Sequence, residues 1–295
     1  MLKIEVAGIV IRLDISDRFL GETIYKFHSA DLSQEGFDED VLIEVSYDSF
    51  PLFPEFEKKK SPVHHVYAFN NNKYYLFSAA DYVTYIKYDA DCSYFILNLN
   101  KGELVSEEYI EAVNSALRRI FLMIIAARGG VSLHSSTVGL SGEAICFSAC
   151  SGTGKTTHTN LWRKYIHGTE ILNGDKGYLF LRDEKVYFFS APWCGTSGDL
   201  IKTEAPVKAV VFLSQAPYNK LSGLSVPEVF MNLLTGCFLP AWDMELYLKA
   251  IDTVETLAAA LVCYRLKCLP DEEAVRTCYH GIYVAVNSNN DVHKS

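Results

Sequence analysis

The chain contains the glycine-rich stretch Ser151-Gly152-Thr153-Gly154-Lys155-Thr156-Thr157. It follows an apolar run at Glu143–Ser148, which predicts a strand, and it opens a segment from about Lys155 to Tyr165, for which we expect a helix. The two glycines allow backbone conformations in which several N–H groups point at one anion without obstruction by side chains. The sequence therefore predicts a strand–loop–helix unit whose loop cradles phosphate groups.

Residue types within this loop predict a nucleoside triphosphate site with magnesium. Lys155 is expected to reach the outer phosphates, and the Thr156 hydroxyl is expected to bind Mg²⁺. Ala149 stands where the usual pattern has its first glycine, which is a mild departure. We expect ATP to be bound by the whole stretch, namely Ser151, Gly152, Thr153, Gly154, Lys155, Thr156 and Thr157.

Residues 1–104 are rich in short runs of β-branched and aromatic residues, which are typical of strands. Turn-like residues separate these runs and predict an antiparallel meander. The runs lie at Lys3–Asp14, Val41–Tyr47, Val63–Phe69, Tyr74–Ser78, Thr84–Tyr88 and Tyr94–Leu99.

From Ser106 to Arg128 the apolar residues recur at helical spacing, and Gly129-Gly130 ends the pattern. Beyond this helix, strands and helices are both expected, so the sequence predicts a mixed α+β fold of the broad α/β class. We expect a strand-rich N-terminal region, 1–104, and a nucleotide-binding domain, 105–295, and we leave open whether they share a sheet. Further strands are expected at Val131–Val138, Tyr178–Leu181, Val186–Ser190, Val207–Leu213 and Tyr264–Cys268, and helices at Val226–Leu234, Met244–Ile251, Thr253–Ala260 and Asp271–Cys278.

Composition and the N-terminal residues indicate which partners and which location to expect. The net charge of -9 argues against a nucleic-acid partner, because phosphate backbones are usually met by a basic surface. No apolar run reaches the roughly 18–20 residues that a membrane span requires, and Met1–Glu5 does not resemble a secretory signal. We therefore expect no membrane partner and a cytoplasmic location, where the eight cysteines, which form no CxxC pair, are expected to be reduced.

Three motifs, in this order and spacing, resemble the HPr kinase/phosphorylase family, and most closely the HPr-kinase-related proteins found beside peptide-modification and cell-envelope genes. They are Leu133-His134-Ser135-Ser136, Ser148–Thr157 and Leu172-Asn173-Gly174-Asp175-Lys176. The resemblance spans roughly residues 105–280. It implies a P-loop kinase core of the HPr kinase type, similar to the nucleotide-binding half of ATP-dependent phosphoenolpyruvate carboxykinase. It also implies assembly into homo-oligomers.

The resemblance implies catalytic roles for three residues. Lys155 acts on the phosphates, and His134 lies close to the catalytic carboxylate. Asp175 falls on the second of the family's paired aspartates, which helps to hold the metal and receives the proton of the acceptor hydroxyl. A hydroxyl acceptor also needs a nearby base on general grounds. Gly174 stands where the first aspartate belongs, which leaves one carboxylate. The alternatives are a turn residue for Asp175 and a core histidine for His134.

A second departure concerns the acceptor. The family's Glu-x-Arg-Gly signature is replaced here by Ala191–Gly198, which contains Trp193, Cys194 and Gly195. We interpret these three residues as one wall of the acceptor site, the alternative being a buried tryptophan that anchors a crossover. Phosphorylation of HPr itself, and the reverse phosphorolysis, are therefore not expected.

The sequence thus predicts an ATP-dependent kinase that transfers the γ-phosphoryl group to a hydroxyl. The acceptor is open: a serine of a peptide or protein, or a small-molecule hydroxyl. One alternative is a nucleotide-sensing module without turnover, to which the absent first aspartate points. A carboxykinase is a weaker alternative, because that chemistry needs additional basic and metal-binding residues and a much larger chain.

Overall fold

The computed structural model describes residues 2–28, 38–48, 65–69, 71–76, 82–100 and 106–284. The chain divides into two compact units, one made of Met1–Gly129 with Leu239–Ala250 and the other of Gly130–Phe238 with Ile251–Ser295. Each unit has its own sheet with both parallel and antiparallel pairs, which confirms the predicted mixed α+β class.

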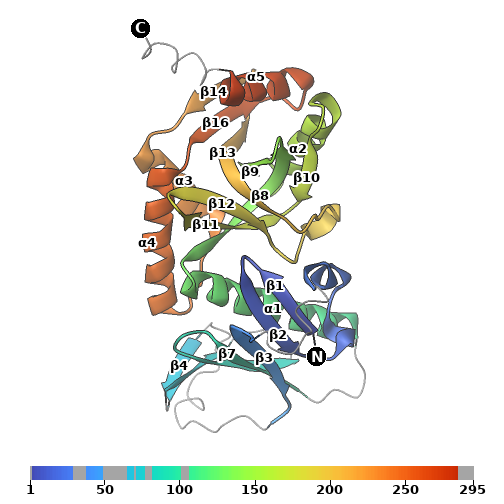
Figure 1. Ribbon diagram of the computed structural model, residues 1–295, viewed down its shortest axis with the longest axis vertical. Helices are drawn as coiled ribbons and strands as arrows, with labels where there is room; N and C mark the ends of the chain where they lie inside the picture. Colours follow the sequence, from blue (N-terminus) through green and yellow to red (C-terminus); the bar gives the residue numbers. More distant parts are fainter. Residues whose placement is uncertain are drawn as a thin grey trace. The chain divides into compact units, whose positions relative to one another are not determined.

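The first unit contains a seven-stranded sheet with strand order β1-β2-β3-β7-β6-β5-β4 (Figure 1). Strands β4 to β7 form the predicted antiparallel meander. The meander prediction is wrong for β3, which pairs in parallel with both β2 and β7. The run Lys3–Asp14 makes two strands, because Ala7 and Gly8 turn the chain with positive φ angles. The strands are β1 (Leu2–Val6), β2 (Ile9–Asp14), β3 (Val41–Ser46), β4 (His65–Phe69), β5 (Asn72–Leu76), β6 (Val83–Asp89) and β7 (Tyr94–Leu99). The predicted strand residues 63–64 and 77–78 lie outside the described part.

Helix α1 (Glu107–Ala127) belongs to this first unit, which differs from the predicted boundary between residues 104 and 105. It packs against β6 and the short 3₁₀ helix η1 (Asp17–Phe19), and its Asn114 donates to the carbonyl of Phe19. A second 3₁₀ helix, η2 (Glu22–Phe27), precedes β3. Helix α1 begins where predicted, because the Ser106 side chain accepts a hydrogen bond from the N–H of Tyr109. The predicted roles of the two regions stay predictions.

The second unit contains a nine-stranded sheet in which β9 lies between β8 and β13. β9 runs antiparallel to β8 and parallel to β13, and β13 runs parallel to β16. The carboxyl ends of β9, β13 and β16 therefore meet at one edge of the sheet. The strands are β8 (Gly130–Leu140), β9 (Glu143–Ser148), β10 (Glu170–Asn173), β11 (Lys176–Arg182), β12 (Lys185–Ser190), β13 (Glu204–Gln215), β14 (Lys220–Gly223), β15 (Cys237–Phe238) and β16 (Cys263–Cys268).

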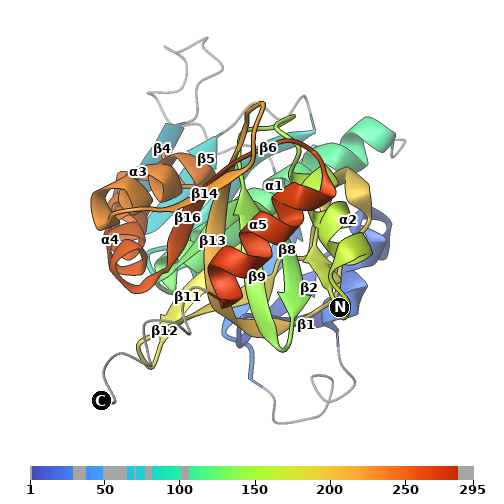
Figure 2. The same cartoon turned by 90° about the horizontal axis from the view of Figure 1, so that it is seen from above.

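Helices α2 (Lys155–Tyr165) and α5 (Glu272–Tyr283) lie beside each other over this sheet (Figure 2). Trp162 of α2 and Val275 of α5 share a buried core with Phe147 of β9 and Val211 of β13. The bounds predicted for α2 are confirmed. Helix α3 spans Val226–Gly236. Helix α4 (Met244–Ala260) is one helix where two were predicted, because no proline or glycine interrupts the run.

None of the helices in the described part of the chain has the length and apolar character needed to cross a membrane.

Candidate functional site

The loop between β9 and α2 has the backbone that the motif requires. Gly152 and Gly154 take φ angles of 79° and 116°, where a side chain would be strained. Gly154 is the N-cap of α2 and has no side chain that could bond the free N–H groups of the first turn. This turn also holds no acidic residue. These donors and the positive end of the helix dipole therefore remain available to an anion.

Lys155 is held inside this loop. It is 9% exposed, and its Nζ donates to the carbonyl of Ala149 at 3.0 Å. Burial lowers the pKa of the Lys155 ammonium, while the negative charge of Asp175 opposes this effect, so the two groups interact electrostatically. Thr153 is half-buried, and its carbonyl accepts a hydrogen bond from Gln215 Nε2 at 3.3 Å. Ser151, Gly152, Thr156 and Thr157 are exposed, and Gly154 is half-buried.

Strand β8 brings His134 to the base of the loop. Ser135, the next residue, pairs with Ser148, the last residue of β9, and the Ser148 hydroxyl donates to the carbonyl of His134 at 2.9 Å. Farther along β8, the buried hydroxyls of Ser136 and Thr159 lie 2.9 Å apart and join the strand to α2. The positions of His134 and Lys155 are thus fixed by the same pair of elements.

Asp175 is positioned by a turn that Asn173 organises. The side chain of Asn173 is fully buried, and its Oδ1 accepts the N–H groups of Asp175 and Lys176 at 2.9 and 3.0 Å. Its Nδ2 donates to the carbonyls of Ala191 and Trp193 at 3.0 and 3.1 Å. Asn173 therefore links the carboxylate turn to the loop that begins at Ala191.

The carboxylate of Asp175 lies between two nitrogen groups. His134 Nε2 is 3.5 Å from Oδ1, and Lys176 Nζ is 3.5 Å from Oδ2. Burial by itself raises the pKa of Asp175, but the contact with His134 and the charge of Lys176 outweigh burial, so the pKa lies below its usual value. Asp175 is therefore an ionised, partly buried acceptor at neutral pH. The structure brings His134 and Asp175 into contact, and their catalytic roles stay predictions.

Gly174 packs so closely against the loop after β12 that a side chain at position 174 would overlap this loop. A Cβ at Gly174 would come within 2.9 Å of the Ser197 Cβ and 3.2 Å of the Cys194 carbonyl. In turn, a Cβ at Gly195 (φ 64°) would lie 2.9 Å from the Cβ of Asp175. The two departures from the family pattern are therefore coupled, because Ser197 fills the position into which a longer residue at 174 would point.

The predicted acceptor residues lie beside the carboxylate. Trp193 is half-buried, Cys194 is buried, and Gly195 is exposed at the start of the short 3₁₀ helix η5 (Gly195–Ser197). The Trp193 carbonyl is held by Asn173, which fits an anchoring role. The closeness of Gly195 to Asp175 fits a site wall as well, so the structure is compatible with both predicted roles of this loop.

The oxygen groups present suit magnesium only in combination with a nucleotide. Among the described residues, no three His, Cys, Asp or Glu side chains group together as a metal site. Mg²⁺ commonly takes one or two protein oxygens and completes its shell with phosphate oxygens and water. The ionised Asp175 and the exposed Thr156 hydroxyl could supply such oxygens.

Three residues near the carboxylate were not predicted as site residues. Asn173 and Lys176 belong to the Leu172–Lys176 motif, and their closeness to Asp175 in the sequence is the signal that could have identified them as site residues. Phe238 comes from β15, which pairs with β8, and its ring lies 5.4 Å from the His134 ring and 4.6 Å from Lys176 Nζ. No local pattern in the sequence points to Phe238.

Comparisons with known proteins add little to this geometry. Among solved structures, the chain is similar to the Hpr(Ser) kinase/phosphatase from Coxiella burnetii, at 8% identity and a TM-score of 0.34, over 56% of this chain and 99% of that one. No protein-family model matches the chain, and no curated protein matches it.

Proposed function

We propose that this protein is an ATP-dependent kinase that transfers the γ-phosphoryl group to a hydroxyl group. The observation that carries the proposal is the meeting of two features at one edge of the sheet. One is a glycine loop with free N–H donors and a buried lysine, and the other is the ionised carboxylate of Asp175, which lies 3.5 Å from His134 on the strand that pairs with the strand entering the loop.

In this proposal the loop and Lys155 hold the phosphates, and the acceptor oxygen attacks the γ-phosphorus in line. Asp175 accepts the proton of the attacking hydroxyl, and His134 and Lys176 hold the carboxylate in place at 3.5 Å each. Bound magnesium would neutralise charge on the phosphates, with Thr156 and Asp175 as its protein ligands. The chain's own contribution is therefore positioning and electrostatic stabilisation.

The acceptor is proposed to be small or flexible, such as a peptide serine or a small-molecule hydroxyl. A Cβ at Gly195 would lie 2.9 Å from the Asp175 Cβ, so the Trp193–Gly195 segment borders the place where a hydroxyl must approach. Half-buried aromatic area at Trp193 suits a compact ligand and excludes water. A folded carrier protein such as HPr would need a complementary surface on the order of 800 Å² on each partner.

A nucleotide sensor without turnover is the second candidate. Ser197 fills the position next to Gly174, so a single carboxylate serves the centre. A site with one carboxylate retains the means to bind ATP with magnesium and loses a share of its catalytic groups.

The two candidates are separated by incubating the purified protein with magnesium and γ-labelled ATP in the presence of a cell extract. A kinase yields a labelled species that mass spectrometry assigns to a hydroxyl, whereas a sensor binds ATP and yields none. Purified HPr serves as the comparison acceptor, and its efficient labelling would contradict the proposed acceptor class.

A further inference from the structure

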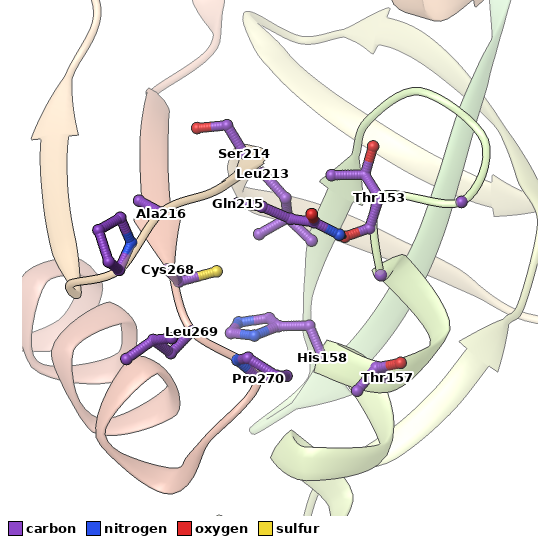
Figure 3. Close-up of a pocket in the computed structure, with 13 residues that line it drawn as sticks. Thr153, Thr157, His158, Leu213, Ser214, Gln215, Ala216, Cys268, Leu269 and Pro270 are labelled. Carbon is purple, nitrogen blue, oxygen red and sulfur yellow. The ribbon is translucent and has the colours of Figure 1, made fainter.

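A cavity of about 730 Å³ lies beside the phosphate loop (Figure 3). Its walls come from the first turn of α2, the end of β13 and the segment after β16. These are carboxyl ends of parallel strands, where open α/β sheets bind their ligands. The volume falls within the range of small-molecule sites.

The cavity and the Asp175 centre flank the loop on different sides. β9 leads into the loop and lies between β8, which carries His134, and β13, whose end lines the cavity. A triphosphate whose outer phosphate faces Asp175 therefore has its nucleoside end directed to the β13 side.

One buried side chain in this cavity has an unused donor. His158 is 3% exposed, and its Nε2 lies 3.1 Å from Trp162 Nε1. The indole N–H can only donate, so Nε2 must be unprotonated and the imidazole proton must sit on Nδ1. Burial lowers the pKa of His158 to about 4, which agrees with a neutral ring.

His158 is one of the residues that line the cavity, and its second ring nitrogen, Nδ1, is not used by the contact with Trp162. No described residue forms a hydrogen bond with this atom, and it does not belong to the sealed, unpaired polar atoms of the described residues. Figure 3 shows the ring extending from α2 toward Cys268 and Pro270. Nδ1–H is therefore an accessible donor on a side chain that lines the cavity, and a ligand that supplies an acceptor can bond it.

We propose that this cavity binds the base of the nucleoside triphosphate, with His158 Nδ1–H donating to a ring nitrogen or carbonyl oxygen of the base. The inference rests on the proposed function, since it assigns a further part of the same site. Leu213, Leu269 and Pro270 supply apolar walls for a flat ring, and Gly152 to Gly154 border the cavity where the phosphates begin.

The test compares ATP with inorganic tripolyphosphate, each with magnesium, by calorimetric titration of the full chain. Trp162→Phe is the background, because it removes the indole donor that His158→Phe alone would leave unpaired. Adding His158→Phe to this background should weaken ATP binding about tenfold and leave tripolyphosphate binding within about twofold. Circular dichroism checks that both variants fold.

A second pair of variants examines the apolar wall without touching His158. Leu269→Ala should weaken ATP binding roughly threefold, whereas Leu181→Ala, at a similar exposure outside the cavity, should not. Equal affinity of the wild type for ATP and tripolyphosphate, or equal losses for both ligands in the variants, would overturn the inference. Neither result would contradict phosphate binding by the loop. Failure of the wild type to bind either ligand would overturn the proposed function and the inference with it.

Discussion

At the residue scale, Asp175 owes its position to the backbone turn that Asn173 closes. Four hydrogen bonds satisfy the Asn173 amide, and two of them fix the N–H groups of Asp175 and Lys176. The backbone turn thus helps to place the carboxylate where it contacts His134 and Lys176. A turn residue and a catalytic carboxylate, alternatives in the sequence, are therefore compatible in one side chain.

Asp175→Asn is expected to keep ATP affinity within a few-fold and to lower phosphoryl transfer by roughly 10²–10⁴, because the amide cannot take the proton. Asp199→Asn is the matched control, since both carboxylate side chains are 28% exposed and Asp199 pairs with Arg163 instead. Transfer rates at saturating ATP measure the effect. Near-normal transfer in Asp175→Asn would move the base role to another group.

Gly174→Asp should destabilise the protein by about 1–3 kcal/mol, because its side chain overlaps Ser197 in a packed loop. Urea unfolding measures the loss. Ser197→Gly in the same chain should recover part of it by vacating the space. A Gly174→Asp variant as stable as the wild type would contradict the coupling between Gly174 and the Cys194–Ser197 loop.

At the element scale, local signals predicted the strand and the helix that flank the phosphate loop. The α2 bounds follow from Gly154 at its start and from helix-compatible residues up to Tyr165. β9 and the first residues of β8 follow from apolar patterning, so the loop and His134 were placed correctly along the chain.

The strands that were not predicted from the sequence form only by pairing with other strands. β14 reads Lys-Leu-Ser-Gly and becomes a strand only by pairing with β16, and β10 and β15 are short segments that pair with β8. The parallel pairs of β3 likewise depend on distant residues. Such information is tertiary, so a single sequence carries little of it.

Helix α2 also predicts a dependence of stability on pH. Burial lowers the pKa of His158 from 6.5 to about 4, so the unfolded chain binds this proton more readily than the folded chain. The contribution of His158 to stability is therefore full above about pH 6.5 and is lost as the pH falls toward about 4, by on the order of 3 kcal/mol.

Urea unfolding across this pH window measures the effect, with His158→Phe/Trp162→Phe as the comparison. The double variant should show a flatter profile between pH 6.5 and 4. The window separates His158 from Asp175 and Asp243, whose pKa values are lowered from an ordinary value of 3.8 and which act at lower pH. Parallel profiles for both proteins would contradict a buried neutral His158.

At the scale of the whole molecule, the first unit is discontinuous in sequence. The segment Leu239–Ala250 belongs to it, because the buried Asp243 accepts hydrogen bonds from Lys73 at 2.9 Å and from Tyr88 at 2.7 Å. Trp242 also stacks on Tyr75 with ring centroids 4.8 Å apart. This return of the chain could not be predicted from the sequence, since it pairs residues far apart along the chain.

Asp243→Ala should lower the free energy of unfolding by about 3 kcal/mol, because it leaves Lys73 and the Tyr88 hydroxyl without this partner. Glu245→Ala is the matched control. Glu245 also pairs with Lys73 but is 76% exposed, so less than about 1 kcal/mol is expected. Equal losses in both variants would contradict the role of Asp243 as a buried anchor of the first unit.

The proposed kinase activity requires that the loop before α2 binds a nucleoside triphosphate for transfer at Asp175. Titration calorimetry with ATP and magnesium tests it most directly, on the wild type, on Lys155→Ala and on Lys164→Ala, whose lysine lies in the last turn of the same helix. The wild type and Lys164→Ala should bind ATP, and a folded Lys155→Ala should lose at least tenfold in affinity, because a charged group that hydrogen-bonds the phosphates is removed. Undiminished affinity in Lys155→Ala, or no binding by the wild type, would contradict it.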